Sequence, residues 1–244
     1  MSFAGKRYWL VGASEGLGFA LARQMAAEGA TLILSARNHD RLVEVCAQLP
    51  NARAETLDVA DDSAVAAAAA RVGEVDGVVF LAGVYWPMSA QACNAAQLIA
   101  MCNVNFTGCA RVIAAVLPGM VARGQGHVVI TGSLSGFRGL PGALGYAASK
   151  AGVMALAESL YADLRGTGIR VQLANPGFIK TRLTAKNAFA MPFLMEPEAA
   201  AASMMRLMKG NSFKASFPML FSWLFRLAQF LPDWAYYRLI APRS

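Results

Sequence analysis

The chain has 244 residues, of which 56% are hydrophobic and only 15% are charged. A chain this long and apolar can bury a substantial core, which excludes a disordered protein and fits one large α/β domain. The formal net charge is +7, but the lysines and arginines are scattered and form no stripe, so we predict no nucleic-acid partner.

Strand-like apolar runs alternate with helical patterns along the whole chain. The predicted strands span residues 7–12, 31–35, 54–57, 77–81, 127–131 and 170–174. Repeated strand–helix units predict an α/β fold with a single Rossmann-type, doubly wound parallel sheet and helices on both faces. We find no linker or break in composition, so residues 1–244 are predicted to form one domain.

The first predicted strand ends in a glycine-rich turn that opens a helix. The turn consists of Gly12, Ala13, Ser14, Glu15, Gly16, Leu17 and Gly18. Glycines at such a turn let the backbone approach a pyrophosphate, and the helix N-terminus adds free N–H groups and a positive dipole end. We therefore predict a dinucleotide site here, and the alternative is a structural turn that binds no ligand.

The ends of the next two predicted strands bear on the identity of the dinucleotide. Arg37 follows the second strand, where an acid commonly binds the ribose of NAD and an arginine meets the 2′-phosphate of NADP. NADP(H) is therefore the predicted cofactor, and an ordinary surface arginine is the alternative. Asp58 ends the third strand, where a carboxylate can accept from the adenine amino group; its alternative role is a helix cap.

Tyr146 and Lys150 stand four residues apart, with Ser133 thirteen residues upstream of the tyrosine. On a helix this spacing places the phenol and the ammonium on one face, with Cβ atoms roughly 5–6 Å apart. An ammonium beside a phenol favours the phenolate and lowers the phenol pKa from about 10 towards the range of a proton-transfer catalyst. Alone, the spacing is weak evidence, because it occurs often by chance in amphipathic helices.

Taken together, these motifs give the chain a clear resemblance. It resembles the short-chain dehydrogenase/reductase family over essentially its whole length. The matching residues are Gly12, Gly16, Gly18, Asp58, Val59, Ala82, Gly83, Asn105, Ser133, Tyr146, Lys150, Pro176, Gly177 and Thr181. One position departs from the family pattern: Leu81 replaces the usual asparagine before Ala82, which removes a polar contact near the central sheet.

The resemblance implies hydride transfer between a nicotinamide and a carbonyl or alcohol, with four catalytic residues. Tyr146 would give its proton to the carbonyl oxygen, and Lys150 would lower the pKa of Tyr146 and hold the nicotinamide ribose. Ser133 would bind the substrate oxygen. Asn105 would hold a water that links Lys150 to a proton relay. The alternatives are structural: a turn serine, a helix-packing asparagine and a core tyrosine.

The implied cofactor site is larger than the catalytic group. Its residues are Gly12, Ser14, Glu15, Gly16, Leu17, Gly18, Arg37, Asp58, Val59, Ala82, Gly83, Tyr146, Lys150, Pro176, Gly177, Ile179 and Thr181. Pro176, Gly177 and Thr181 would frame the nicotinamide. A protein that binds NADP(H) as a sensor or scaffold, without turnover, is the alternative function, and the intact catalytic group favours the enzyme.

Residues 181–195 form a predicted lid over the substrate. Its apolar members are Leu183, Phe189, Met191, Pro192, Phe193, Leu194 and Met195. Because a pocket takes its polarity from its lining, the lid predicts a lipophilic carbonyl or alcohol substrate. The alternative is that these side chains only pack the lid closed.

The C-terminal segment, residues 213–244, is rich in aromatic side chains. Between Pro218 and Pro232, the polar residues Ser222, Arg226 and Gln229 are spaced as one narrow stripe on an apolar helix. The segment is too short to span a bilayer unaided, since roughly 20 residues are needed.

Three roles fit this segment: a short final strand and a helix buried in a homo-oligomer, contact with a membrane interface, and a flap over the substrate. Burial in a dimer or tetramer ranks first, because the family commonly forms both. In the membrane role, aromatic side chains would lie at headgroup level and arginines near anionic lipid. These side chains are Trp223, Arg226, Trp234, Tyr236, Tyr237, Arg238 and Arg243.

The cysteines and histidines suggest neither a metal site nor a disulfide framework. No two of the four cysteines form a Cys-x-x-Cys pair, and the chain has only two histidines. We therefore expect no metal, reduced thiols and a cytoplasmic location, with membrane association as the alternative. The first apolar run is too short for a signal-peptide core.

Overall fold

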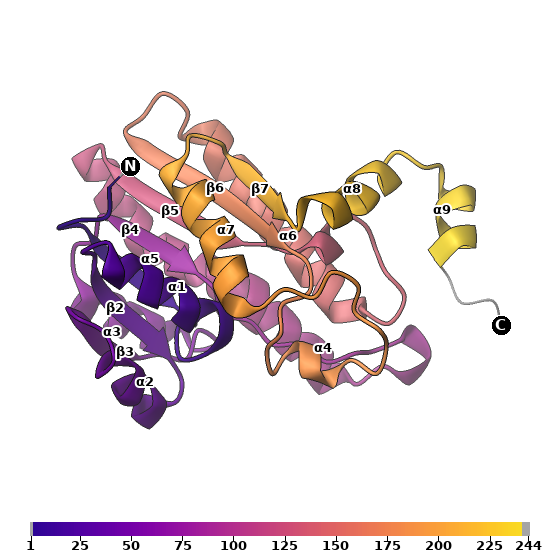
Figure 1. The fold of residues 1–244 in the computed structure, drawn as a ribbon, viewed down its shortest axis with the longest axis horizontal. Helices are drawn as coiled ribbons and strands as arrows, with labels where there is room; N and C mark the ends of the chain where they lie inside the picture. Colours follow the sequence, from indigo (N-terminus) through magenta and orange to yellow (C-terminus); the bar gives the residue numbers. More distant parts are fainter. Residues whose placement is uncertain (1, 241–244) are drawn as a thin grey trace.

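A sheet of seven parallel strands forms the centre of the molecule, in the order β3-β2-β1-β4-β5-β6-β7 (Figure 1). The computed structural model describes residues 2–240. The strands are β1 (Arg7–Val11), β2 (Thr31–Ala36), β3 (Ala52–Thr56), β4 (Gly77–Phe80), β5 (Gly126–Thr131), β6 (Ile169–Pro176) and β7 (Lys214–Phe217). Because every pairing is parallel, all carboxyl ends lie at one edge. The predicted doubly wound sheet is confirmed.

Helices cover both faces of this sheet. They are α1 (Gly16–Ala27), α2 (His39–Cys46), α3 (Asp62–Val72), α4 (Ala95–Met101), α5 (Gly108–Arg123), α6 (Leu144–Asp163), α7 (Pro197–Lys209), α8 (Met219–Ala228) and α9 (Asp233–Ile240). Strand side chains alternate between the faces: Tyr8 and Leu10 join one buried cluster, and Trp9 and Val11 join the other. Residues of α1 and α7 complete the first cluster, and residues of α3, α5 and α6 complete the second.

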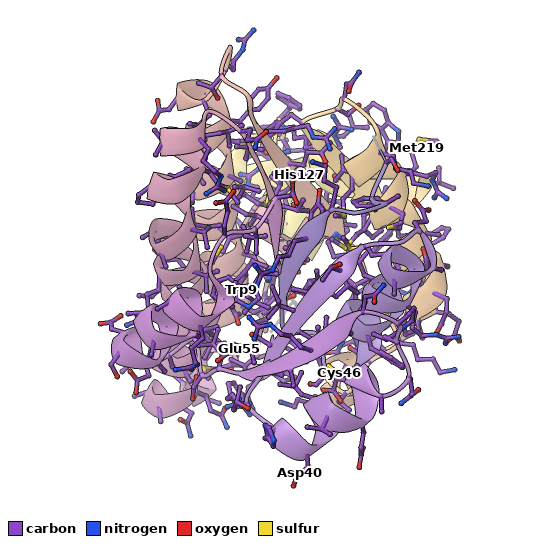
Figure 2. All side chains as sticks on the ribbon, turned by 90° about the vertical axis from the view of Figure 1, so that its left-hand side faces the viewer. Trp9, Asp40, Cys46, Glu55, His127 and Met219 are labelled. Atoms are coloured by element: carbon purple, nitrogen blue, oxygen red, sulfur yellow. The ribbon has the colours of Figure 1, made fainter. Side chains whose placement is uncertain are left out.

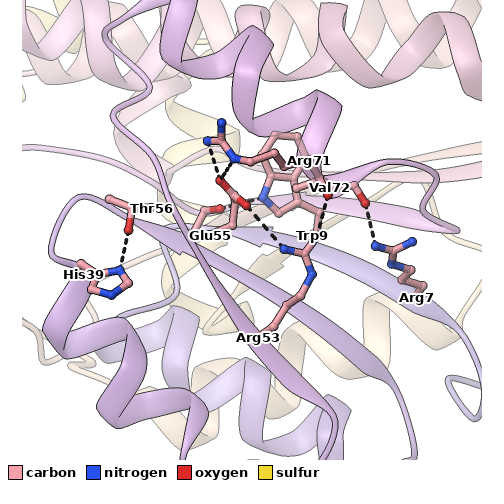
Figure 3. Close-up of polar contacts among 9 residues, drawn as sticks. Arg7, Trp9, His39, Arg53, Glu55, Thr56, Arg71 and Val72 are labelled. Carbon is pink, nitrogen blue, oxygen red and sulfur yellow. Dashed lines mark hydrogen bonds and ion pairs between the residues drawn. The ribbon is translucent and has the colours of Figure 1, made fainter.

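Polar contacts hold the edge strand β3 and its neighbours in register. Glu55 is only 7% exposed and accepts hydrogen bonds from Arg71 at 2.7 and 2.9 Å and from Arg53 at 3.4 Å (Figure 3). On the central strand, the indole of Trp9 donates to the Ser35 hydroxyl at 2.8 Å. A buried carboxylate is tolerated here because two guanidinium groups compensate its charge.

His127 lies at the start of β5, in the interior of the fold (Figure 2). Its ring nitrogens bond to the Tyr8 hydroxyl at 2.8 Å and to the Gln172 side chain at 2.9 Å. Burial lowers the pKa of His127 to about 3, so the ring is neutral near pH 7. This position is near the amino end of the strand, and the residue packs the sheet.

Candidate active site

The glycine-rich turn lies where the chain order of the sheet reverses, between β1 and β4. At Gly12, φ is +96°, and a Cβ would lie 2.4 Å from the backbone nitrogen of Ala82. A Cβ at Gly18 would lie 2.1 Å from the Gly12 carbonyl oxygen. Only glycine allows these approaches, so the predicted turn and the segment Ala82-Gly83 meet at one point. In open α/β sheets, ligands bind in the crevice at such a reversal.

Glu15, to which no specific contact could be assigned from sequence, joins the turn to two distant segments. Its carboxylate pairs with Arg41 of α2 at 3.1 Å and with Arg182 of the lid at 2.6 Å. Arg41 also donates to the Ser14 carbonyl at 3.1 Å. Neither arginine is found by sequence reasoning, because both contacts join residues that are far apart in the chain.

Arg37 follows β2 and is exposed. Within residues 2–240 its guanidinium has no carboxylate or hydrogen-bond partner, so it is available to an anion. Asp58 is half-buried after β3 and accepts from the Ala60 N–H at 2.9 Å. The cap of α3 is Asp61, which accepts from Ala64 at 3.0 Å. Asp58 is therefore not that helix cap, and the alternative role is wrong.

Two further predicted contacts are apolar. Val59 is buried against the close approach of Gly108, where a Cβ would lie 2.8 Å from the valine side chain. Leu17 packs its side chain against the cluster on the α1 face of the sheet. Leu17 is half-buried, so its packing contributes to the position of the turn.

Asn105 is completely buried in a π-helical turn, Cys102–Thr107, between α4 and α5. Its side chain accepts from the Val84 N–H at 2.7 Å and donates to the Val84 carbonyl and the Ser149 hydroxyl, both at 3.0 Å. It thereby ties the loop after β4 to α6. Leu81, in place of the family's asparagine, packs against the apolar core. Asn105 therefore anchors this loop, and Leu81 makes no polar side-chain contact there.

Ser133, Tyr146 and Lys150 meet at the carboxyl end of β5. Ser133 follows that strand, and Tyr146 and Lys150 lie in the first two turns of α6. The Lys150 ammonium is buried, donates to the Thr131 carbonyl at 2.8 Å and lies 5.9 Å from the centre of the Tyr146 ring. The spacing-based prediction of one shared helix face is consistent with this position.

The pKa of Tyr146 differs from the prediction. Its side chain is half-buried, and loss of solvation raises the pKa to about 12, despite a hydrogen bond from Ser133 that lowers it. The nearby Tyr85 phenol raises it further. Burial also lowers the pKa of Lys150 to about 8. The expected net lowering of the Tyr146 pKa is therefore wrong, because desolvation is the largest effect on the phenol and raises its pKa.

Tyr85, which sequence reasoning missed, lies directly beside Tyr146. The ring centres are 5.0 Å apart in an edge-to-face arrangement. The Tyr85 hydroxyl donates to Asn187 of the lid at 2.9 Å, and Lys186 donates to the Tyr85 carbonyl at 2.7 Å. Tyr85 of the loop after β4 therefore covers one side of the Tyr146 ring, and the lid holds Tyr85 there.

The segment predicted to frame the nicotinamide follows β6. Pro176 ends that strand, and the Gly177 N–H donates to Phe217 of β7 at 2.7 Å. Ile179 is buried, and Thr181 approaches the glycine-rich turn, since a Cβ at Gly16 would lie 2.9 Å from its methyl group. This brings the start of the lid against the predicted pyrophosphate site.

A dinucleotide-binding α/β oxidoreductase is the class of protein that this sheet, this turn and these side chains define. The family model "short chain dehydrogenase" matches residues 6–190. The chain therefore belongs to the short-chain dehydrogenase/reductase family, whose members are nicotinamide-dependent oxidoreductases.

Individual relatives agree with this assignment. An uncharacterized oxidoreductase of Myxococcus xanthus is 39% identical over 235 residues, which cover 92% of each chain. A solved short-chain dehydrogenase/reductase family protein shares 30% identity and a TM-score of 0.82, covering 88% of this chain and 95% of its own. An alcohol dehydrogenase from Thermococcus sibiricus, solved with 5-hydroxy-NADP, shares 25% identity and a TM-score of 0.79, covering 87% and 95%.

Proposed function

We propose that the protein is an NADP(H)-dependent oxidoreductase that interconverts a lipophilic carbonyl compound and its alcohol. The observation that supports this best is the grouping of Ser133, Tyr146 and Lys150 at one strand end, beside a loop anchored by Asn105. The nearby glycine-rich turn supports a dinucleotide as the redox partner. We place the enzyme in the cytoplasm as a single domain, and its four free cysteines are in keeping with reducing conditions.

The residues at the carboxyl edge fit NADP(H). The tight Gly12–Gly18 approach would bring backbone N–H groups to the pyrophosphate, and the unpaired Arg37 would meet the 2′-phosphate. Asp58, Val59, Ala82 and Gly83 would surround the adenosine. Pro176, Gly177, Ile179 and Thr181 would frame the nicotinamide, whose chemistry when bound is to donate or accept the hydride.

The protein's own part in the reaction is to supply and stabilise a proton. Because its pKa is raised to about 12, Tyr146 is protonated at neutral pH and can donate to the carbonyl oxygen. Ser133 would bind that oxygen, and the Lys150 ammonium would stabilise the phenolate that remains. Asn105 would hold a water in the relay that returns the proton.

The pH dependence of carbonyl reduction should follow Lys150. Burial lowers its pKa to about 8, so its stabilising charge is present below pH 8 and lost as the pH rises above it. We expect kcat/KM to fall above about pH 8 towards a tenfold loss per pH unit. In Lys150→Arg, whose guanidinium does not titrate in this range, the residual activity should lack this fall. A wild-type profile flat to pH 10 contradicts the role.

The lid supports a lipophilic substrate. Phe189, Phe193 and Leu194 are exposed at 54%, 51% and 42%, which argues against the alternative that they only pack the lid closed. Exposed aromatic side chains on the lid, which contacts Tyr85 through Asn187, provide apolar surface for a ligand.

A substrate panel tests the proposed function directly. Ketosteroids, fatty aldehydes, quinones and 3-oxoacyl compounds would each be offered with NADPH and with NADH, and cofactor oxidation followed by absorbance. We expect turnover with at least one apolar carbonyl and NADPH. If the wild-type protein binds NADPH but turns over no carbonyl above the rate of Tyr146→Phe, the alternative function, a sensor or scaffold that binds NADP(H), is favoured.

A further inference from the structure

The two C-terminal helices form an arm that projects from the body of the molecule beyond β7 (Figure 1). This arm, defined as Met219–Ile240, begins at the periphery of the fold, where Met219 lies (Figure 2). One stripe of α8 points outward and is entirely apolar, with Leu220 70% and Leu224 63% exposed. The full stripe comprises Met219, Leu220, Trp223, Leu224 and Leu227.

The exposed apolar surface continues past α8. Phe230 is 85% exposed between the helices, and Trp234, Tyr237 and Leu239 are exposed on α9. A concentration of exposed apolar side chains of this kind on a folded protein marks a binding site. Aromatic residues with polar edges, such as tryptophan and tyrosine, are those that favour a bilayer's headgroup region.

The opposite face of α8 packs against the body of the protein. Phe221 is buried, with its ring centre 5.8 Å from that of Phe178 and 5.5 Å from that of Phe193 in the lid. Ser222, expected on the polar stripe, is buried and donates to the Met219 carbonyl at 2.7 Å. The solvent-facing side of α8 is therefore mainly apolar, with Arg226 as its exposed cation, and the packing of Phe221 against the lid does not account for these exposed side chains.

Contacts of Arg138 and Tyr236 hold the arm in place. Arg138, in the loop between Ser133 and α6, donates to the carbonyls of Ala228 at 2.9 Å and Leu231 at 2.7 Å. Its guanidinium also pairs with Asp233 and lies 3.9 Å from the centre of the Tyr236 ring. The Tyr236 hydroxyl, in turn, donates to Gly139 at 2.8 Å. The apolar stripe is thus presented in a defined orientation.

The charge on the arm is positive. Asp233 is its one acid, and Arg138 already compensates that carboxylate. Within the described residues, Arg226 and Arg238 pair with no carboxylate; Arg226 lies 5.0 Å from the Trp223 ring centre. Arg243, a further predicted lipid contact, lies outside the described residues. Cations beside exposed tryptophan and leucine suit an anionic bilayer surface.

A cavity at the base of the arm has the same character. It measures about 440 Å³ and opens between α6 and α8. Trp223, Leu227 and Phe230 line it together with the unpaired cation of Arg226 and with Lys214, which pairs with Glu158 of the same lining at 3.2 Å. This combination suits an acyl chain with an anionic headgroup.

The length of the arm decides between lying on a membrane and crossing it. The 10 residues of α8 span only ~15 Å, about half of the hydrocarbon thickness. By length and composition alone, Ala95–Arg123 could span a bilayer. That segment, however, contains the buried Asn105 and packs against α3 and α6 in the fold. Contact through the arm is therefore parallel to the surface.

A second copy of the chain fits the arm less well. In a two-fold contact the same patch meets itself, so two positively charged arms would be brought together, and the one acid of each arm is already compensated by Arg138. Exposed apolar side chains elsewhere, such as Ile99 and Phe106, offer a separate surface for a partner subunit.

We propose that the arm docks the protein on anionic lipid bilayers, with the apolar stripe of α8 and the exposed Trp234 and Tyr237 of α9 in the headgroup region. Tyr236, predicted as a lipid contact, is buried and is not part of this surface. The test is flotation of the whole protein with vesicles of phosphatidylcholine, with and without 30% phosphatidylglycerol. We expect flotation with the anionic vesicles that weakens at 0.5 M salt. In the double variant Leu220→Glu with Leu224→Glu, we expect binding to the vesicles to weaken by about tenfold or more. Arg226→Glu with Arg238→Glu should reduce binding selectively on the anionic vesicles.

The matched control is Val43→Glu with Val121→Glu, which places two acids at exposed apolar positions on α2 and α5. It should float like the wild-type protein. NADPH binding by every variant reports that the fold is intact. Docking is overturned if the wild-type protein stays with the unbound fraction on both vesicle types, or if the α8 variant floats as well as the control. If the wild-type protein does not float and the α8 variant has a lower oligomer mass by light scattering, the arm binds a second copy of the chain instead.

Discussion

Replacing Tyr146 by phenylalanine is expected to lower kcat for carbonyl reduction by about 10²–10⁴-fold, the usual contribution of a positioned general acid. The substitution removes the phenol oxygen and the hydrogen bond with Ser133 that bears on its pKa. It keeps the ring, whose edge-to-face contact with Tyr85 at 5.0 Å fixes its position. NADPH binding should therefore stay within about twofold of wild type. Steady-state kinetics and cofactor fluorescence titration measure the two effects separately.

The same helix provides a control for this substitution. Tyr161 lies on α6, is 38% exposed and stacks on Phe213 with ring centres 4.1 Å apart. Tyr161→Phe removes an identical hydroxyl far along the helix and should leave kcat unchanged. Turnover by Tyr146→Phe within tenfold of wild type would show that another group supplies the proton. Loss of NADPH binding in Tyr146→Phe would instead point to a structural role.

Reversing the charge of Arg37 should change the cofactor preference. If Arg37 meets the 2′-phosphate, Arg37→Glu removes a charge-assisted contact worth ~1.5–3 kcal/mol and adds repulsion. The KM for NADPH should then rise by about 10- to 100-fold. The KM for NADH, which has no 2′-phosphate, should stay the same or fall, because a carboxylate at this position can bind the ribose hydroxyl. Initial rates with both cofactors give the ratio.

Arg165 is the matched position for this test. It is also exposed, but it lies in the turn after α6, which leads to the amino end of β6. Arg165→Glu produces the same change in net charge far from the proposed phosphate site. An equal rise in the NADPH KM for both variants would attribute the effect to overall charge. A wild-type preference for NADH would refute the role of Arg37.

Much of the fold could be predicted because its signals are local. The alternation of strand and helix patterns gave six of the strands within a few residues, and it predicted their parallel arrangement. The seventh strand, β7, has only four residues, two of them half-buried, and follows no periodic signal of its own. It forms because the end of β6 offers unpaired backbone groups to Lys214–Phe217.

The candidate site was predictable to a similar extent. Gly12 and Gly18 can be recognised from their spacing in the sequence, because only glycine tolerates the close backbone contacts of the turn. Tyr85, Arg41 and Arg182 could not be found this way, since each reaches the site across a long stretch of sequence. No local pattern encodes such contacts.

The sequence by itself determined the sheet, the turn at its reversal and the spacing of Tyr146 and Lys150, because these depend on neighbours within one or two helical turns. Only the tertiary structure decided the direction of the Tyr146 pKa, since burial depends on residues distant in sequence, such as Tyr85 of the loop after β4. The same holds for α8. Its apolar composition is visible in the sequence, but packing of Phe221 against the lid decided that the apolar stripe faces outward.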